Sequence, residues 1–243
     1  MTFITLLLCL SLERFLSIGK ALHRFNWLSA YVNKVQQCFG QYAWAKNPYI
    51  FFLLIVLPIV LLFALIYVPS HTVLCGFVGF VLGAAVLFYC LGPDNIYESK
   101  THHRFIFNKA NETLFAVIFW FALLGPIAAL TYRLVERCAQ QVTSHPGLGE
   151  VAAKLKGFLD WLPVRLFTII NALVGKSHFF LNYLLRDPSF NGEMIERGSR
   201  VALGLPDNTE LKDENYPEAL QLIDRALILF LLIVFAVTLG MLL

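Results

Sequence analysis

The chain has 243 residues, of which 58% are hydrophobic and 14% are charged, and its mean hydropathy is +0.68. In a soluble domain about a quarter of the residues are charged, so this composition excludes an ordinary cytosolic enzyme. Four stretches contain no Asp, Glu, Lys or Arg: Tyr49–Val68, Thr72–Leu91, Thr113–Tyr132 and Ala226–Leu243. As a helix, each is long enough to cross about 30 Å of hydrocarbon. We therefore expect an all-α polytopic membrane protein, a single membrane domain over residues 1–243, with four transmembrane helices in contact with the lipid bilayer.

The charges divide unevenly along the chain. Up to Arg186 there are 15 Lys and Arg against 7 Asp and Glu, and from Asp187 onward there are 4 against 9. The basic residues interleave with the spans as membrane anchors do, and without a long basic run they do not indicate nucleic-acid binding. The acids gather in residues 187–218, which we expect to be a solvated connector loop around one short helix near Glu193–Leu203.

Residues 1–24 are predicted to form an amphipathic helix. Its polar residues step by three or four positions and make one stripe: Thr2, Thr5, Cys9, Glu13, Ser17, Lys20 and Arg24. The stripe either packs against protein inside a bundle or faces the membrane interface. Glu13 accordingly either snorkels to the interface or forms an intramembrane ion pair.

Topology follows from the basic residues between the spans. Gly19–Pro48 has four Lys and Arg and no acid, so the positive-inside rule places it in the cytoplasm. Pro58 is expected to kink the first span. The second span has a small-residue packing face made of Gly76, Gly79, Gly83 and Ala84. Gly125-Pro126 interrupts the third span. The chain then returns to the cytoplasmic side in one of two ways: the third span turns back as a re-entrant hairpin, or a later apolar helix crosses the membrane again.

Chemistry-bearing motifs are scarce. The sequence has no nucleotide-binding loop and no hydrolase motif, its five cysteines are scattered, and His102-His103 lacks ligands at metal-binding spacing. We therefore predict reduced cysteines, no metal and no cofactor, and the sequence assigns no catalytic residue.

Two polar groups stand out beside the apolar segments. Pro163 suits the first turn of a helix over 163–185, which would place Asp160 at its positive end. Arg165 then forms either a structural salt bridge, with Asp160, Glu13 or Glu136 as partner, or a clamp for an anion such as phosphate.

Asn111 and Glu112 open the third span. One interpretation is that they cap the helix in the ordinary way. The other is that they line a site at the cytoplasmic membrane face together with Asp160 and Arg165. The predicted binding residues are Asn111, Glu112, Asp160, Arg165 and Glu13, for an anionic small ligand or a protein partner.

Several blocks resemble one family. They are Leu12-Glu13-Arg14-Phe15, Ala110-Asn111-Glu112, Phe119-Trp120-Phe121-Ala122-Leu123-Leu124-Gly125-Pro126, Tyr132-Arg133-Leu134 and Asp160-Trp161-Leu162-Pro163-Val164-Arg165-Leu166. Together with Ala129-Leu130 they resemble the AmpE family of bacterial inner-membrane proteins, over about a third of the chain. The resemblance implies a multi-pass inner-membrane modulator linked to β-lactamase induction and cell-wall recycling, a signalling role rather than an enzymatic one.

Two alternatives are kept. The AmpE family is similar in turn to the CobD/CbiB membrane enzymes, amide-forming ligases of cobamide biosynthesis that use ATP. At the start of the third span those enzymes look like Glu-Asn-x-x-Asp, whereas this chain has Ala110 and Leu114 at the two acidic positions. A small transporter is the other alternative, and it would require paired broken helices in repeated halves.

Overall fold

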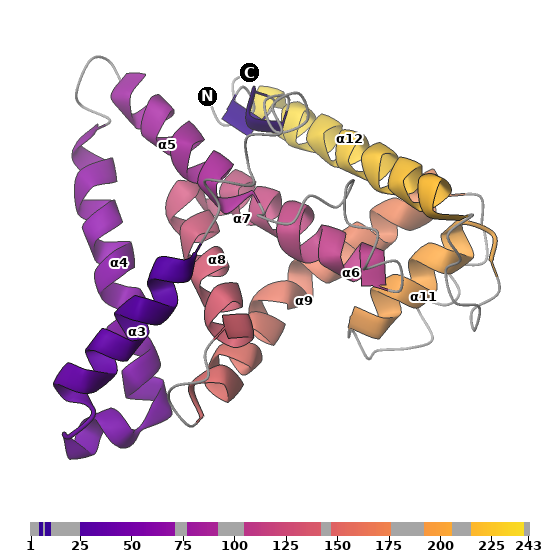
Figure 1. Cartoon of the computed structure of the whole chain (residues 1–243). Helices are drawn as coiled ribbons and strands as arrows, with labels where there is room; N and C mark the ends of the chain where they lie inside the picture. The colour runs from indigo at the N-terminus through magenta and orange to yellow at the C-terminus, as the bar shows by residue number, and fades with distance from the viewer. Residues whose placement is uncertain are drawn as a thin grey trace. The chain divides into compact units, whose positions relative to one another are not determined.

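The computed structural model describes residues 5–6, 8–10, 25–70, 77–91, 105–141, 147–175, 192–205 and 215–240. Regular structure in these residues is helical throughout, which confirms the predicted all-α class (Figure 1). The chain clusters into two compact units. Unit 1 comprises Met1–Pro93 with Val117–Leu159, and unit 2 comprises Asp94–Ala116 with Asp160–Leu243.

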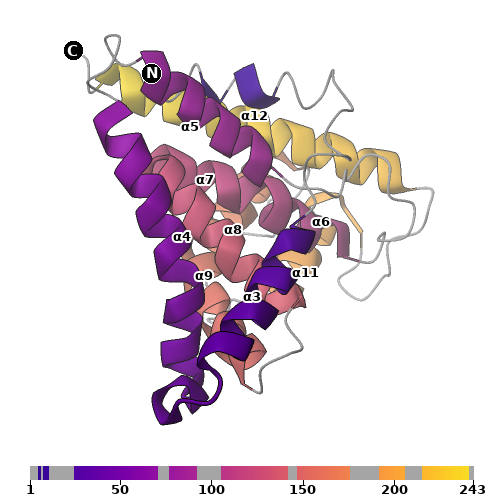
Figure 2. The same ribbon diagram turned by 60° about the vertical axis from the view of Figure 1, so that its left-hand side comes forward.

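Unit 1 is built from α3 (Asn26–Phe39), the short η1 (Ala43–Lys46), α4 (Pro48–Ser70), α5 (Phe77–Cys90), nearly all of α7 (Ala116–Leu124), α8 (Pro126–Gln141) and the first part of α9 (Leu148–Val174). In Figure 2, α4, α5 and α8 lie together, and contacts join all three pairs. A Cβ on Gly83 of α5 would lie 3.8 Å from Pro126 and 3.9 Å from Tyr67, so a small residue suits this packing.

The start of α4 shows how local sequence sets a helix end. Asn47 accepts the Tyr49 backbone N–H on its Oδ1 at 3.1 Å, and Pro48 begins the helix. Both are favourable, because an Asn side chain satisfies an orphan donor and proline has no N–H to satisfy. The helix then continues through Pro58 to Ser70.

Unit 2 is built from α6 (Ile106–Ala110), the π-helical η4 (Asn111–Phe115), the second part of α9, α11 (Gly192–Ala202) and α12 (Tyr216–Gly240). Its core centres on Phe115, whose ring centroid lies 4.8 Å from that of Phe167 and 4.6 Å from that of Phe230. One ring from η4 thus contacts both α9 and α12. Such aromatic pairs add about 0.5–1.5 kcal/mol each beyond their buried area.

Among the residues that the structure describes, three helices are long and apolar enough to cross a membrane: α4, α9 and α12. They carry exposed apolar side chains such as Leu65, Phe158 and Leu232, which suit lipid contact. α5 is also apolar but shorter, at 14 residues, and residues 71–76 of that expected hairpin lie outside the described part. Of the four predicted spans, the first and the last therefore fall on long helices, α4 and α12.

The predicted span Thr113–Tyr132 is not one continuous helix. Gly125 adopts φ +83°, a left-handed value that favours glycine, and Pro126 begins α8 on its far side. Figure 1 shows α8 leaving α7 in a new direction. The Gly-Pro pair therefore divides the apolar run into two shorter helices.

Two further expectations were wrong. α9 does not begin at Pro163 but passes through it from Leu148, so Asp160 lies inside the helix and not at its positive end. A helix tolerates an internal proline where other contacts fix its course. The predicted short helix in the acidic segment is present as α11, but Ile195, Glu196 and Ser199 are buried, so this helix is not a solvated connector.

Of the predicted N-terminal helix, the structure describes only residues 5–6 and 8–10. Thr5, Leu6 and Cys9 are buried, and the Cys9 thiol donates to the Ala84 carbonyl of α5 at 3.4 Å. At these positions the stripe packs against protein, as in the bundle alternative. Cys38, Cys90 and Cys138, like Cys9, form no disulfide in the described chain, and Cys75 lies outside it.

The contact between α9 and α11 gives a stability prediction. A Cβ on Gly175 would meet the Ala202 carbonyl oxygen at 2.6 Å, too close without moving α11. We expect Gly175→Val to lower the free energy of unfolding by about 1–3 kcal/mol, as overpacking does. Chemical unfolding of the protein in detergent micelles measures the change.

Gly157→Ala is the matched control on the same helix, because nothing lies within 4 Å of its Cβ position. We expect this variant to gain up to about 1 kcal/mol from the better helix propensity of alanine. Equal losses in the two variants would contradict the packing of Gly175 against Ala202.

Candidate functional site

In unit 2, Glu196 of α11 caps a different helix. Its Oε1 accepts the Asn108 backbone N–H of α6 at 2.8 Å, and the Phe107 N–H also donates to the carboxylate. The N-cap residue of α6, Phe105, offers no side-chain acceptor. Because the first N–H groups of a helix have no partner within it, α11 supplies the acceptor that the local sequence lacks.

A second contact links α11 to α9. Asn171 donates from Nδ2 to the Ser199 hydroxyl at 3.0 Å, and both residues are buried. Ser199 lies three residues after Glu196, so the two polar side chains occupy neighbouring positions on the α11 surface. This surface therefore contacts α6 and α9 through hydrogen bonds.

Asn111 lies at the start of η4, and it is 1% exposed. It is one turn from Phe115, as Asn171 is one turn from Phe167, and the rings of these two phenylalanines are in contact. Among the described residues, neither amide atom of Asn111 has a hydrogen-bond partner. We call Asn111, Asn171, Glu196 and Ser199 the polar layer of unit 2.

The polar layer contains an ionisable group that responds near neutral pH. Burial raises the pKa of Glu196 from 4.5 to about 7, although the two backbone N–H donors and the charge of Arg200 act in the opposite direction. Its Oε2 has no hydrogen-bond partner among the described residues. A half-satisfied carboxyl of this kind can gain or lose a proton when its surroundings change.

The π-helical turn adds to the case for a functional site here. Such turns are rare, because they break the regular i to i−4 hydrogen bonding, and they occur frequently at functional sites. This one contains the predicted residues Asn111 and Glu112. Glu112 is half-buried, and its carboxylate accepts a hydrogen bond from Asn108 Nδ2 at 3.4 Å. The layer can offer amide, hydroxyl and carboxyl groups to a polar ligand or to a rearranged helix.

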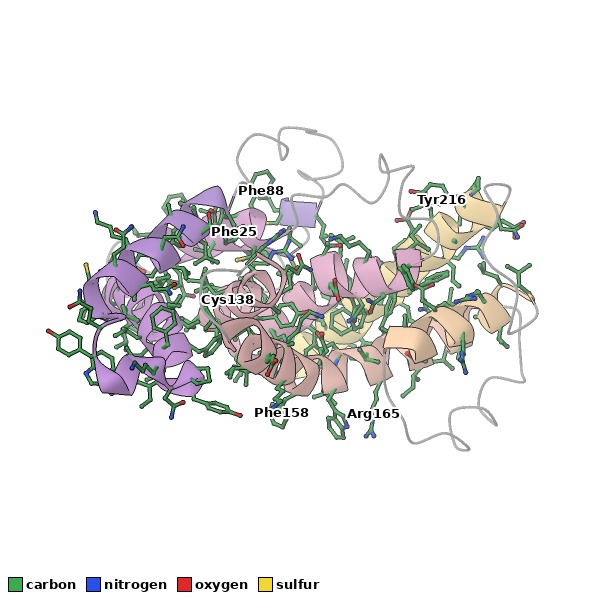
Figure 3. The ribbon with its side chains drawn as sticks, turned by 60° about the horizontal axis from the view of Figure 1, so that its bottom comes forward. Phe25, Phe88, Cys138, Phe158, Arg165 and Tyr216 are labelled. Atoms are coloured by element: carbon green, nitrogen blue, oxygen red, sulfur yellow. The ribbon has the colours of Figure 1, made fainter. Side chains whose placement is uncertain are left out.

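The other predicted site residues are placed elsewhere. Arg165 is half-buried and lies over Trp161, with its guanidinium carbon 4.0 Å from the ring centroid, and it projects away from α9 (Figure 3). Asp160 is also half-buried, about 140° around α9 from Arg165. Glu13 lies outside the described residues. The structure therefore separates Asn111, in the buried polar layer, from the half-buried Arg165 beside Trp161.

A cluster of charges is buried in unit 1. Arg133 donates to Glu136 Oε2 at 3.1 Å, and Arg137 Nε lies 3.4 Å from the same oxygen. Arg133 and Glu136 are 0% exposed, and the Arg137 guanidinium lies 5.4 Å from the centre of the Phe25 ring. Arginine stays charged in proteins, so the carboxylate of Glu136 is the counter-charge that this packing requires.

No group of three His, Cys, Asp or Glu side chains within the described ranges is arranged to hold a metal ion. His102 and His103 lie outside those ranges.

Sequence reasoning missed Glu196, Ser199 and the burial of Arg133. Glu196 lies in an acidic segment that contains glycine and proline. Because this composition is typical of solvated loops, the sequence did not indicate that Glu196 is buried. The available signal was the strong amphipathic pattern of residues 192–202 and the spacing of Arg133, Glu136 and Arg137 on one helical face.

The comparisons with known proteins add no assignment. No protein-family model, no curated protein and no solved structure matches the chain.

The raised pKa of Glu196 predicts a pH dependence of stability. Because the folded protein holds this proton more tightly than the unfolded chain, the contribution is fully present below about pH 4.5 and is lost as the pH rises through about 7. We expect a loss on the order of 3 kcal/mol across this window. Unfolding free energies of wild type and Glu196→Gln between pH 4 and 8 measure it. If the two profiles run parallel, the carboxyl does not titrate in this range.

The buried charge cluster gives a second prediction. Glu136→Gln leaves two buried arginines without their counter-charge, and we expect it to cost about 3–5 kcal/mol of unfolding free energy. Glu150→Gln, at an exposed position in the first turn of α9, is the matched control and should cost less than about 0.5 kcal/mol. The double variant Arg133→Met with Glu136→Met should lose less than Glu136→Gln alone, and a larger loss would refute the pairing.

Proposed function

We propose that the protein is an AmpE-like regulatory modulator of the bacterial inner membrane, linked to β-lactamase induction and peptidoglycan recycling. In this proposal Arg165 and its neighbours bind an anionic ligand or a cell-wall-recycling partner. The observation that carries the binding role is the pairing of Arg165 with Trp161, which is 49% exposed.

The pairing suits recognition of an anion for a physical reason. A guanidinium stacked on an indole ring loses less conformational entropy when it binds, because the ring already restricts its planar fork. The fork keeps N–H donors at its edge, where a phosphate or carboxylate can accept two of them. Arg165 itself is half-buried, and the exposed ring of Trp161 marks the side from which a ligand or a partner protein would approach the pair.

The family blocks also fit a structural reading of the resemblance. Residues Phe119, Phe121, Ala129, Leu130, Tyr132, Arg133 and Leu134 are all buried. These positions contribute to packing, whereas Leu123, Leu124, Trp161 and Leu162 of the same blocks are exposed.

The ligase alternative finds less support. Ala110 and Leu114, which stand where the enzymes carry acidic residues, are 1% and 6% exposed, so a side chain at either position is removed from water. A carboxylate there would require a partner to offset its desolvation. This supports the modulator over the ligase as the function of this chain.

A deletion strain tests the proposal. We expect deletion to change β-lactamase induction and to leave cobamide levels unchanged, whereas the ligase alternative requires the reverse. Both quantities are measured in the same cultures. A loss of cobamide synthesis, or unchanged induction, would overturn the modulator assignment.

Point variants test the binding role separately. We expect Arg165→Ala to reproduce the deletion phenotype at unchanged protein abundance, and Arg165→Lys to restore it only partly, because lysine lacks the planar fork. Lys154→Ala removes an exposed cation from the same helix and should behave as wild type. If Arg165→Ala also behaves as wild type, the binding site lies elsewhere.

A further inference from the structure

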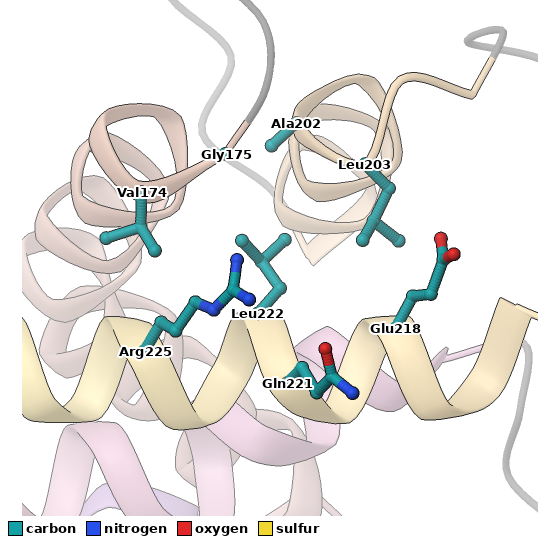
Figure 4. Close-up of a pocket in the computed structure, with 8 residues that line it drawn as sticks. All are labelled: Val174, Gly175, Ala202, Leu203, Glu218, Gln221, Leu222 and Arg225. Atoms are coloured by element: carbon teal, nitrogen blue, oxygen red, sulfur yellow. The ribbon is translucent and has the colours of Figure 1, made fainter.

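A small pocket lies in unit 2 where α9, α11 and α12 meet (Figure 4). Its cavity is about 110 Å³ in volume. It is lined by Val174, Gly175, Ala202, Leu203, Glu218, Gln221, Leu222 and Arg225. Sites for drug-sized ligands have about 300–1,000 Å³, so this pocket is suited to a small polar group and not to a nucleotide or large cofactor.

The polar side chains of the pocket come from one face of α12. Gln221 and Leu222 lie three and four residues after Glu218, and Arg225 lies four and three residues after them, so all four share one side of the helix. Glu218 and Arg225 point toward the ends of α9 and α11, with Leu222 between them (Figure 4). Within the described chain neither Glu218 nor Arg225 forms a hydrogen bond or ion pair, so both charges are available to a ligand.

The charges of the pocket are divided in space. Arg225 offers a cationic fork, and Glu218 offers a carboxylate two helical turns away, about 10 Å along the axis. The C-terminal ends of α9 and α11, at Val174 and Ala202, also line the pocket and carry partial negative charge. The pocket is therefore complementary to a zwitterion, with its anion at Arg225 and its cation toward Glu218.

The position of the pocket along α12 indicates the source of that zwitterion. Arg225 is the last charged residue of the chain, and the 18 residues from Ala226 to Leu243 would span about 27 Å as a helix. Ile228, Leu232, Phe235 and Leu239 in this stretch are exposed and apolar. Arg225 thus lies where the hydrocarbon of a bilayer would begin, at the depth of phospholipid phosphates.

We infer that this pocket binds the headgroup of an aminophospholipid such as phosphatidylethanolamine. The lipid phosphate pairs with Arg225, and the ammonium donates to Glu218 and to the helix ends. A choline headgroup has no N–H to donate, and a glycerol headgroup has no cation, so each satisfies only the arginine. This site goes beyond the proposed function, because it shares no residue with the Trp161–Arg165 pair.

Native mass spectrometry of the full-length protein tests the inference. The probes are phosphatidylethanolamine, phosphatidylcholine and phosphatidylglycerol with identical acyl chains. We expect phosphatidylethanolamine to bind at least about tenfold more tightly than the other two, because charge-assisted hydrogen bonds of the ammonium are absent from both.

Variants then separate the two halves of the headgroup. Glu218→Gln should bring phosphatidylethanolamine down to the affinity of phosphatidylcholine, and Arg225→Gln should weaken all three lipids by about tenfold. Glu150→Gln and Lys154→Gln make the same charge changes at exposed positions of α9 and should alter nothing. Either pocket variant binding all three lipids like wild type would overturn the assignment.

The source of the headgroup is tested with soluble competitors. Glycerophosphoethanolamine and inorganic phosphate should displace the lipid only at far higher concentration, because neither brings acyl chains to the apolar surface of α12. Displacement by either at the lipid's own concentration would mean that the pocket takes a soluble phosphate. Tighter binding of phosphatidylglycerol than of phosphatidylethanolamine would refute the role of Glu218.

Discussion

The cost of removing a polar group from water governs this structure. In a chain so rich in apolar residues, each buried charge or amide needs a partner inside the protein. In unit 1, Glu136 forms an ion pair with Arg133. In unit 2, Glu196 accepts hydrogen bonds from N–H groups of α6 that have no partner within that helix. The first contact lies within α8, whereas the second joins α11 to α6 and so helps to fix which faces of those two helices meet.

The polar layer of unit 2 meets this requirement incompletely. Asn111 and the second oxygen of Glu196 are buried with no hydrogen-bond partner among the described residues. A layer in that state is less stable than an apolar one and responds to a proton, a ligand or a shift of a neighbouring helix. This property suits a regulatory protein, in which two arrangements of similar free energy are an advantage.

α12 shows how one helix can serve three environments. Its buried face, with Ala219, Ile223 and Phe230, packs into the core of unit 2. The first turns present charged side chains to a small pocket, and the C-terminal half exposes apolar side chains. The change along the helix, from polar surroundings to lipid, makes a headgroup site between them physically reasonable.

The sequence by itself determined the all-α class, the apolar helices α4 and α12 and the helix in the acidic segment, because hydropathy and periodicity are local properties. It also singled out Asn111 and Arg165. Only the tertiary structure decided that Asn111 belongs to a buried polar layer with Glu196, while Arg165 lies on an exposed tryptophan. The break at Gly125-Pro126 was predicted from the sequence, but the continuous course of α9 through Pro163 and the burial of Arg133 were decided at this level. These features depend on the packing of segments that are distant in sequence, and a local pattern does not record that packing.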